Sequence, residues 1–178
     1  MKDLLIEAIL KSITTNWDIP ALADFHGKSF SYGELATRIA HLHLFFKGAG
    51  IKQGDKIALC AKNSAEWGAI FLACITYGAV AVPLLHEFHV SNVAHLVAHS
   101  EAKLLFADKN IADNLDLEKM PGVDGIVIVG EDKLFFSRNN KVAEAMASVN
   151  QAFAKAYPRG YTAADVHYTQ PESDALAL

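Results

Sequence analysis

Histidine is concentrated in one short stretch of this chain, and imidazole is a common protein ligand for transition metals. The stretch contains His86, His89, His95 and His99. His95 and His99 are four positions apart, so a helix would place both imidazoles on one face. No cysteine or carboxylate at a matching spacing completes an obvious ligand set. On a helical wheel the pair lies opposite Val93 and Val97, and we therefore predict loop or surface histidines rather than a metal site.

An acid beside an aromatic residue, Glu66 and Trp67, resembles a binding or catalytic pair. A simpler structural explanation is available, because Asn63 and Glu66 have the spacing of a helix-capping pair and Trp67 falls on the apolar face of the helix that follows. Ser64 is a helix-start residue by context, and no serine stands in a G-x-S-x-G elbow. We therefore predict that these residues are structural.

The glycine-rich segment GAGIKQG at residues 48–54 superficially resembles a dinucleotide fingerprint. Its last spacing is one residue too long, and it follows a predicted helix rather than a strand, so we predict a helix stop and a tight turn. Cys60 and Cys74 are the only cysteines and fall in apolar segments, which predicts free buried thiols. The residues alone assign no catalytic, cofactor-binding or metal-binding position.

Composition is that of an ordinary soluble globular protein, with 178 residues, 52% hydrophobic residues and a formal net charge of −4. The mild acidity argues against a nucleic-acid partner. Charges interrupt residues 1–11, which favours an amphipathic surface helix over a signal peptide. The uncharged run at residues 67–85 is broken by Gly78 and Pro83, so we expect no membrane span. A cytoplasmic location is the prediction.

The first segments that position these residues are a hairpin and a helix. Residues 25–30 place Gly27 and Lys28 between two short arms, which predicts a small N-terminal hairpin. Ser31 and Glu34 then match a capping box, and the helix that they begin is predicted to stop at a nearby glycine, Gly48 or Gly50.

Strands and helices alternate along the rest of the chain. Apolar runs predict strands at residues 56–60, 80–85, 103–107 and 125–129. Helical periodicity predicts helices at residues 63–78, 91–100 and 140–157, whereas residues 111–122 are predicted to form a loop and residues 161–173 a connector. Short alternating elements predict an α/β fold with a doubly wound, mostly parallel sheet flanked by helices.

Several motifs together resemble the acyl-CoA synthetase branch of the adenylate-forming, AMP-binding superfamily. These motifs are SYGEL at residues 31–35, Gly54-Asp55, Asn63-Ser64 with Glu66-Trp67, and the A-x-x-x-x-G-A-x-x-x-P pattern at residues 73–83. The resemblance is good over residues 29–107 and loose over residues 109–170. Overall likeness favours the long-chain fatty-acid–CoA ligase type.

That resemblance implies an enzyme that activates a carboxylic acid, such as a fatty acid, with ATP and Mg²⁺ and then transfers the acyl group to coenzyme A. PESDAL at residues 171–176 is similar to the lead-in to the family's phosphate loop, which does not follow. We therefore expect residues 1–178 to be the N-terminal part of a larger AMP-binding domain. Within it we expect a core unit at 1–110, a further strand, helix and connector at 111–170, and the start of a strand at 171–178.

The matching positions are mainly scaffold in this family, so the resemblance transfers no catalytic residue to this chain. A fragment of this kind is expected to be inactive alone, to bind no cofactor, and to have the remainder of its own chain as its main partner. Surfaces left uncovered by a truncation predict a possible homodimer. The alternative is a stand-alone α/β binding or regulatory module. A flavodoxin-like cofactor carrier fits the alternation but lacks a phosphate loop at a strand end.

Overall fold

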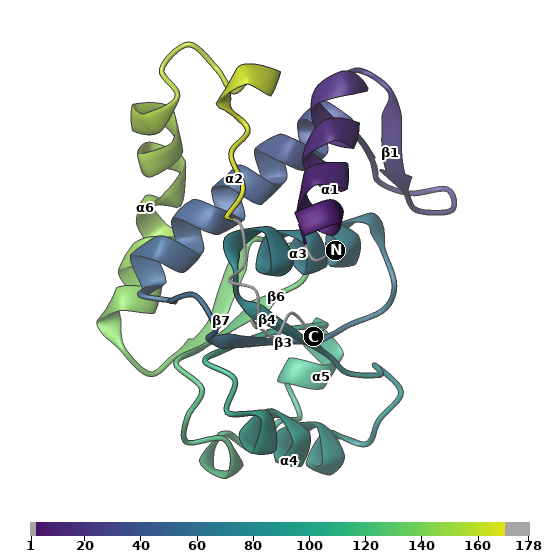
Figure 1. The fold of residues 1–178 in the computed structure, drawn as a ribbon. Coiled ribbons are helices and arrows are strands. Elements are labelled where there is room, and N and C mark those ends of the chain that lie inside the picture. Colours follow the sequence, from purple (N-terminus) through teal and green to yellow (C-terminus); the bar gives the residue numbers. More distant parts are fainter. Residues whose placement is uncertain (1–2, 170–178) are drawn as a thin grey trace.

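A five-stranded, mostly parallel sheet organises the computed structural model, which describes residues 3–169 (Figure 1). The strands are β1 Pro20–Ala23, β2 Ser29–Ser31, β3 Lys56–Cys60, β4 Val80–Pro83, β5 Leu104–Ala107, β6 Gly125–Ile128 and β7 Lys133–Ser137. The helices are α1 Asp3–Thr15, α2 Tyr32–Ala49, α3 Ala65–Tyr77, α4 Val90–Ser100, α5 Lys109–Ala112 and α6 Asn140–Ala156, with short 3-10 turns η1 Leu117–Lys119 and η2 Ala163–Asp165. The strand predicted at residues 171–178 lies outside the described residues.

The sheet has the order β4-β3-β5-β6-β7, with β4 and β7 at its edges. Strands β3, β4, β5 and β6 are parallel, and β7 is antiparallel to β6. Helices α2, α3 and α6 cover one face, and α4, α5 and η1 cover the other (Figure 1). The parallel strands are therefore buried on both sides, which explains their continuous apolar sequences and confirms the predicted fold class.

Capping residues set the ends of α2 as predicted. The Ser31 hydroxyl accepts from the Glu34 N–H at 3.2 Å, and the Glu34 carboxylate accepts from the Ser31 N–H at 2.7 Å. Of the two glycines predicted to end this helix, Gly50 does so in the left-handed conformation at φ 83°, whereas Gly48 lies inside the helix. Gly78 ends α3 in the same way at φ 87°.

The predicted capping pair at the start of α3 is wrong. Ser64, not Asn63, is the N-cap, and its hydroxyl accepts from the Trp67 N–H at 3.1 Å. The Glu66 carboxylate binds Lys28 and Arg38 instead of a backbone N–H. The spacing was compatible with a cap, but two distant cations compete for this carboxylate more effectively than a helix end does.

The N-terminal hairpin forms, but its arms differ from the prediction. Strands β1 and β2 pair antiparallel, with Ala23 opposite Ser29. Phe25 therefore lies in the turn rather than in an arm, and it is 93% exposed. Asp24 closes the turn by donating its N–H to the Lys28 carbonyl at 2.7 Å.

Several short elements were absent from the prediction. The segment at residues 111–122, predicted as a loop, contains the end of α5 and the turn η1. Strand β7 was not predicted at all, and it adds an antiparallel edge to the sheet.

The uncharged run at residues 67–85 divides into α3 and β4 as predicted. Across residues 3–169, none of the helices combines the length and hydropathy that crossing a bilayer requires.

The connections of the sheet change direction between β3 and β5. Helix α3, which leads from β3 to β4, lies on one face, and α4, which leads from β4 to β5, lies on the opposite face. Open α/β sheets bind their ligands outside the carboxyl ends of the strands, near such a reversal. The residues that follow β3, β5 and β6 therefore lie where this fold places a ligand.

Candidate functional site

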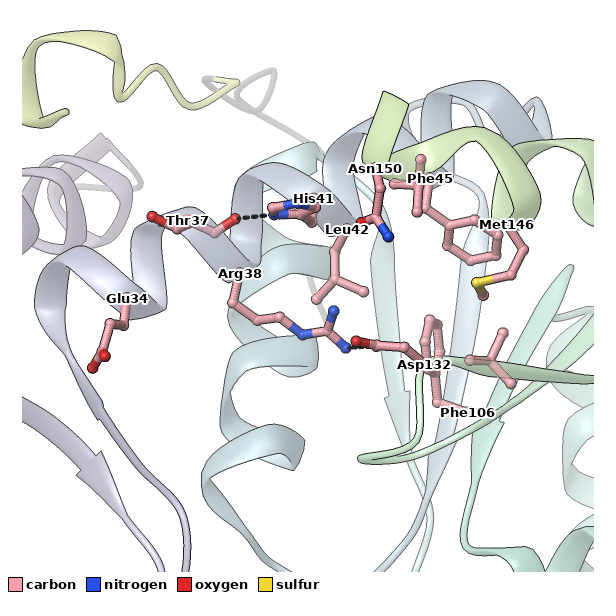
Figure 2. Close-up of a pocket in the computed structure, with 12 residues that line it drawn as sticks. Glu34, Thr37, Arg38, His41, Leu42, Phe45, Phe106, Asp132, Met146 and Asn150 are labelled. Atoms are coloured by element: carbon pink, nitrogen blue, oxygen red, sulfur yellow. Dashed lines mark hydrogen bonds and ion pairs between the residues drawn. The ribbon is translucent and has the colours of Figure 1, made fainter. Parts of the chain in front are cut away.

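A cavity of about 390 Å³ opens between α2, α6 and the sheet, beside the turn that follows β6 (Figure 2). Its lining residues are Glu34, Thr37, Arg38, His41, Leu42, Phe45, Phe106, Val127, Asp132, Met146, Val149 and Asn150. Helix α2 supplies half of them because successive turns of its face run along the cavity. None of these positions was selected as a site residue from the sequence, because they are spread over more than 100 positions and share no motif.

The cavity has an apolar floor and a polar rim. Phe45, Phe106 and Val127 form part of the floor and are buried. Arg38 and Asp132 lie at the rim and point toward one another (Figure 2). The space therefore suits a small molecule with an apolar body and a polar end.

Arg38 belongs to an ion-pair network rather than standing free for an anionic ligand. Its Nε donates to Glu66 Oε1 at 2.5 Å, and its Nη2 contacts both Glu66 and Asp132. Glu66 is only 3% exposed and also accepts from Lys28 Nζ at 2.9 Å. Two cations and two carboxylates balance in charge, so the network holds together the hairpin, α2, α3 and the β6–β7 turn.

The Asp132 end of this network is its more accessible part. The Asp132 side chain is 66% exposed, and its backbone is left-handed at φ 50°. Solvent screens an ion pair at such a position. The buried contact between Glu66 and Arg38 therefore carries most of the stabilisation.

His41 places an imidazole ring at the other side of the cavity. Its Nδ1 lies 3.0 Å from the Thr37 carbonyl oxygen, and its ring stacks on Phe153 with centroids 3.7 Å apart. A carbonyl can only accept, so Nδ1 is the donor of this hydrogen bond. Among the described residues that line the cavity there is no serine or cysteine for the ring to activate.

His43 lies two positions after His41 on α2 and faces away from the cavity, into the core beside α3. Its Nε2 lies 3.1 Å from the Ala73 carbonyl oxygen and 3.0 Å from Thr76 Oγ1. Burial lowers the pKa of His43 to about 4, so the ring is neutral at physiological pH. The ring also packs against Tyr77 and Tyr168. A neutral, enclosed histidine of this kind is structural.

The strand ends at the reversal of the sheet are joined by hydrogen bonds. The Lys62 N–H donates to Asp108 Oδ2 at 2.9 Å, and the Asp108 N–H donates to the Cys60 carbonyl at 3.2 Å. Burial, with a smaller contribution from Asp108, raises the pKa of Cys60 to about 11. This thiol is protonated at neutral pH and is therefore a poor nucleophile.

The residues singled out from the sequence are dispersed. His95 and His99 are exposed on α4 as predicted, His86 is partly buried, and His89 caps α4 by accepting from the Ser91 N–H at 3.3 Å. Across residues 3–169 no three histidine, cysteine or acidic side chains gather in a metal-binding geometry.

The two cysteines are free and buried, as predicted. Burial raises the pKa of Cys74 to about 12, which makes this thiol inert as well.

The described residues do not fit the triphosphate of ATP. Phosphate binding requires a cradle of backbone N–H groups or unpaired cations. Arg38, the cation that lines the cavity, is paired with two carboxylates, and residues 3–169 contain no glycine-rich loop after a parallel strand. This part of the chain can bind and position groups, but it holds no assembled set of nucleophile, base and phosphate cradle.

The sheet order and the crossovers define a doubly wound α/β fold, and its cavity lies near the strand ends. The family model of the AMP-binding enzymes matches residues 11–177, which is nearly the whole chain. The protein therefore belongs to the AMP-binding enzyme family, as the sequence motifs indicated.

Two of the relatives are named as fatty-acid ligases. The chain is 34% identical over 87 residues to a medium-chain fatty-acid–CoA ligase of Escherichia coli (strain K12), covering 49% of this chain and 15% of the relative. It is 32% identical over 110 residues to a fatty acid–[acyl-carrier-protein] ligase of Streptomyces coeruleorubidus, covering 59% and 20%. The chain thus spans a fifth or less of the length of these curated relatives.

Solved structures agree on the fold. An anthranilate–CoA ligase in complex with anthranoyl-AMP superposes with a TM-score of 0.73 at 16% identity. The superposition covers 97% of this chain and 30% of that enzyme. At this identity the likeness establishes the shared fold and transfers no residue role.

Proposed function

We propose that this chain is part of an ATP-dependent ligase that activates a carboxylic acid as an acyl-adenylate and transfers the acyl group to coenzyme A. The match of the AMP-binding enzyme model to residues 11–177 is the observation that carries this proposal. The mostly parallel sheet and the motifs of α2 and α3 agree with it.

A fatty acid is the substrate class that we propose, of the long-chain fatty-acid–CoA ligase type. The names of two relatives support a fatty acid, although one of them transfers it to an acyl-carrier protein rather than to coenzyme A. ATP and Mg²⁺ are the proposed cofactors of the complete reaction. A cytoplasmic location and a homodimer formed through uncovered surface belong to the same proposal.

For the 178 residues themselves we propose a scaffold role, as the N-terminal part of the large adenylating domain. The division into 1–110, 111–170 and 171–178 is part of this proposal. The chain alone is expected to release no pyrophosphate from ATP and to bind ATP weakly. The paired state of Arg38 and the neutral, structural state of His43 support this expectation.

The test begins with the gene and continues with an assay. The coding DNA downstream of Leu178 is read first, and an open frame encoding a Ser/Thr/Gly-rich loop within about ten codons supports the ligase. The whole reading frame is then expressed and assayed for pyrophosphate release and thioester formation with acids from acetate to palmitate. The 178-residue chain is assayed in parallel. Strong pyrophosphate release by the short chain contradicts the scaffold role, and no thioester from any acid contradicts the ligase.

The cavity beside Arg38 favours a second candidate, a stand-alone binding or regulatory module. A stop codon directly after Leu178 supports this candidate. In that case the 178-residue chain is titrated with fatty acids, and a saturable quench of Trp67 or Trp17 fluorescence reports binding. Replacing Phe45 by Ala, at the cavity floor, is expected to weaken such binding more than replacing the distant, exposed Phe25 by Ala.

A further inference from the structure

The exposed face of α4 presents two imidazoles one helical turn apart. The His95 and His99 ring planes differ by only 14°, and their centroids are 6.2 Å apart. Both side chains are exposed to solvent. The two rings are thus free to reorient together.

This spacing matches what a chelated metal requires. Bonds of about 2.0–2.1 Å from zinc to each imidazole nitrogen, at a tetrahedral angle, place the two nitrogens roughly 3.3 Å apart. Parallel rings on one face reach that separation by tilting toward one another, because exposed side chains can change rotamer at little cost. Helical histidines four positions apart are used in this way in metalloproteases.

Glu101 directly follows α4, two positions after His99, and the carbonyl groups at this end of the helix add partial negative charge near the pair. Lys56 pairs with the Glu101 carboxylate at 2.9 Å, so Glu101 supplies partial rather than full compensation. Asn92 precedes His95 by three positions and borders the same face beside Leu96.

Although the sequence pattern alone favours surface histidines without a metal, we propose from the ring geometry that His95 and His99 form a bidentate site for a divalent transition-metal ion, with water completing the coordination. Imidazole is a suitable ligand for Zn²⁺, Ni²⁺ and Cu²⁺. The Irving–Williams order predicts that Cu²⁺ is the ion bound most tightly. The site lies on the face of the sheet opposite the cavity and is independent of acid activation (Figure 1).

The test is a titration of the 178-residue chain with Zn²⁺ and Cu²⁺ by calorimetry at pH 7.5 in a non-coordinating buffer. His95→Asn and His99→Asn are each expected to lower the affinity at least about tenfold, because one imidazole loses the benefit of the other's effective concentration. The double variant is expected to bind Zn²⁺ and Cu²⁺ at most about tenfold more weakly than either single variant, because chelation is already lost in the single variants. His26→Asn is the matched control, because His26 is an exposed histidine on the hairpin turn whose positive φ of 54° suits asparagine.

Unchanged affinity in both single variants, or an equal loss in His26→Asn, overturns the proposal. A spectroscopic readout separates chelation from single-site binding. Paramagnetic resonance of bound Cu²⁺ is expected to show two coordinated nitrogens in the parent chain and one in each single variant. One nitrogen in the parent chain also overturns the proposal. Circular dichroism of each variant verifies that α4 and the remaining helices are intact.

Discussion

The enclosed His43 ring makes stability depend on pH. Its folded pKa of about 4 lies below the ordinary value of 6.5 because burial penalises the charged form. As the pH falls through 6.5 the unfolded chain takes up a proton that the folded chain refuses, so stability is lost as the pH falls from 6.5 to about 4. The two pKa values differ by about 2.5, and each pKa unit corresponds to about 1.4 kcal/mol, which gives a loss of up to roughly 3 kcal/mol.

The assay is urea unfolding followed by tryptophan fluorescence at several pH values between 7.5 and 4. Carboxylates elsewhere also titrate at the acidic end, so the informative quantity is the difference between the parent chain and His43→Gln. Glutamine keeps a donor for the Ala73 carbonyl but has no charge to gain. Tyr77 and Tyr168 beside the ring stay neutral across this range, because burial raises the pKa of both.

We expect His43→Gln to be less stable than the parent at pH 7.5 and to close most of that gap, or reverse it, near pH 4. His26→Asn, which alters an exposed histidine, is expected to run parallel to the parent curve. Parallel curves for His43→Gln and the parent would show that the ring is protonated as easily in the folded chain as in the unfolded one. That result would refute the argument from burial.

Two further substitutions test the packing around α2. Glu66→Gln removes the buried carboxylate that neutralises the half-buried Arg38, and it is expected to cost about 3 kcal/mol in urea unfolding, whereas the exposed Glu131→Gln should change stability by less than about 0.5 kcal/mol. An equal loss of stability in Glu66→Gln and Glu131→Gln would contradict a stabilising role for the ion-pair network. Gly33→Ala brings a methyl group to 2.6 Å from the Trp17 ring and is expected to cost about 1–3 kcal/mol, whereas Gly122→Ala enters open space and should be nearly neutral. Thermal unfolding measures both, and an unaffected Gly33→Ala would show that Trp17 moves aside freely.

Local signals in the sequence predicted most of the fold. The capping box at Ser31 and the left-handed glycine Gly78 act within a few residues, so their effect is visible in a short window of sequence. Strand β7 escaped prediction because Phe135 and Phe136 are adjacent and the strand is only half-covered, which gives neither a clean alternation nor a continuous buried run.

The residues that line the candidate site could not be identified from the sequence. Glu66 was assigned to a helix cap because the spacing to Asn63 allows it, and its true partners, Lys28 and Arg38, are 38 and 28 positions away. The floor of the cavity combines Phe45 with Phe106, which only the sheet brings together. Pairings of this kind depend on tertiary structure, and a single sequence contains no local trace of them.

The two edges of the described sheet are poorly suited to accept another strand. Strand β4 ends at Pro83, which has no N–H to donate, and β7 begins at the exposed Lys133 and pairs with β6 through a register irregularity between Ile126 and Val127. Proline, lysine and local irregularity each discourage edge-to-edge strand pairing. A second molecule that met these edges would find few ladder hydrogen bonds to complete. The five-stranded sheet, as far as the structure describes it, is therefore protected against growth by the addition of strands at its edges.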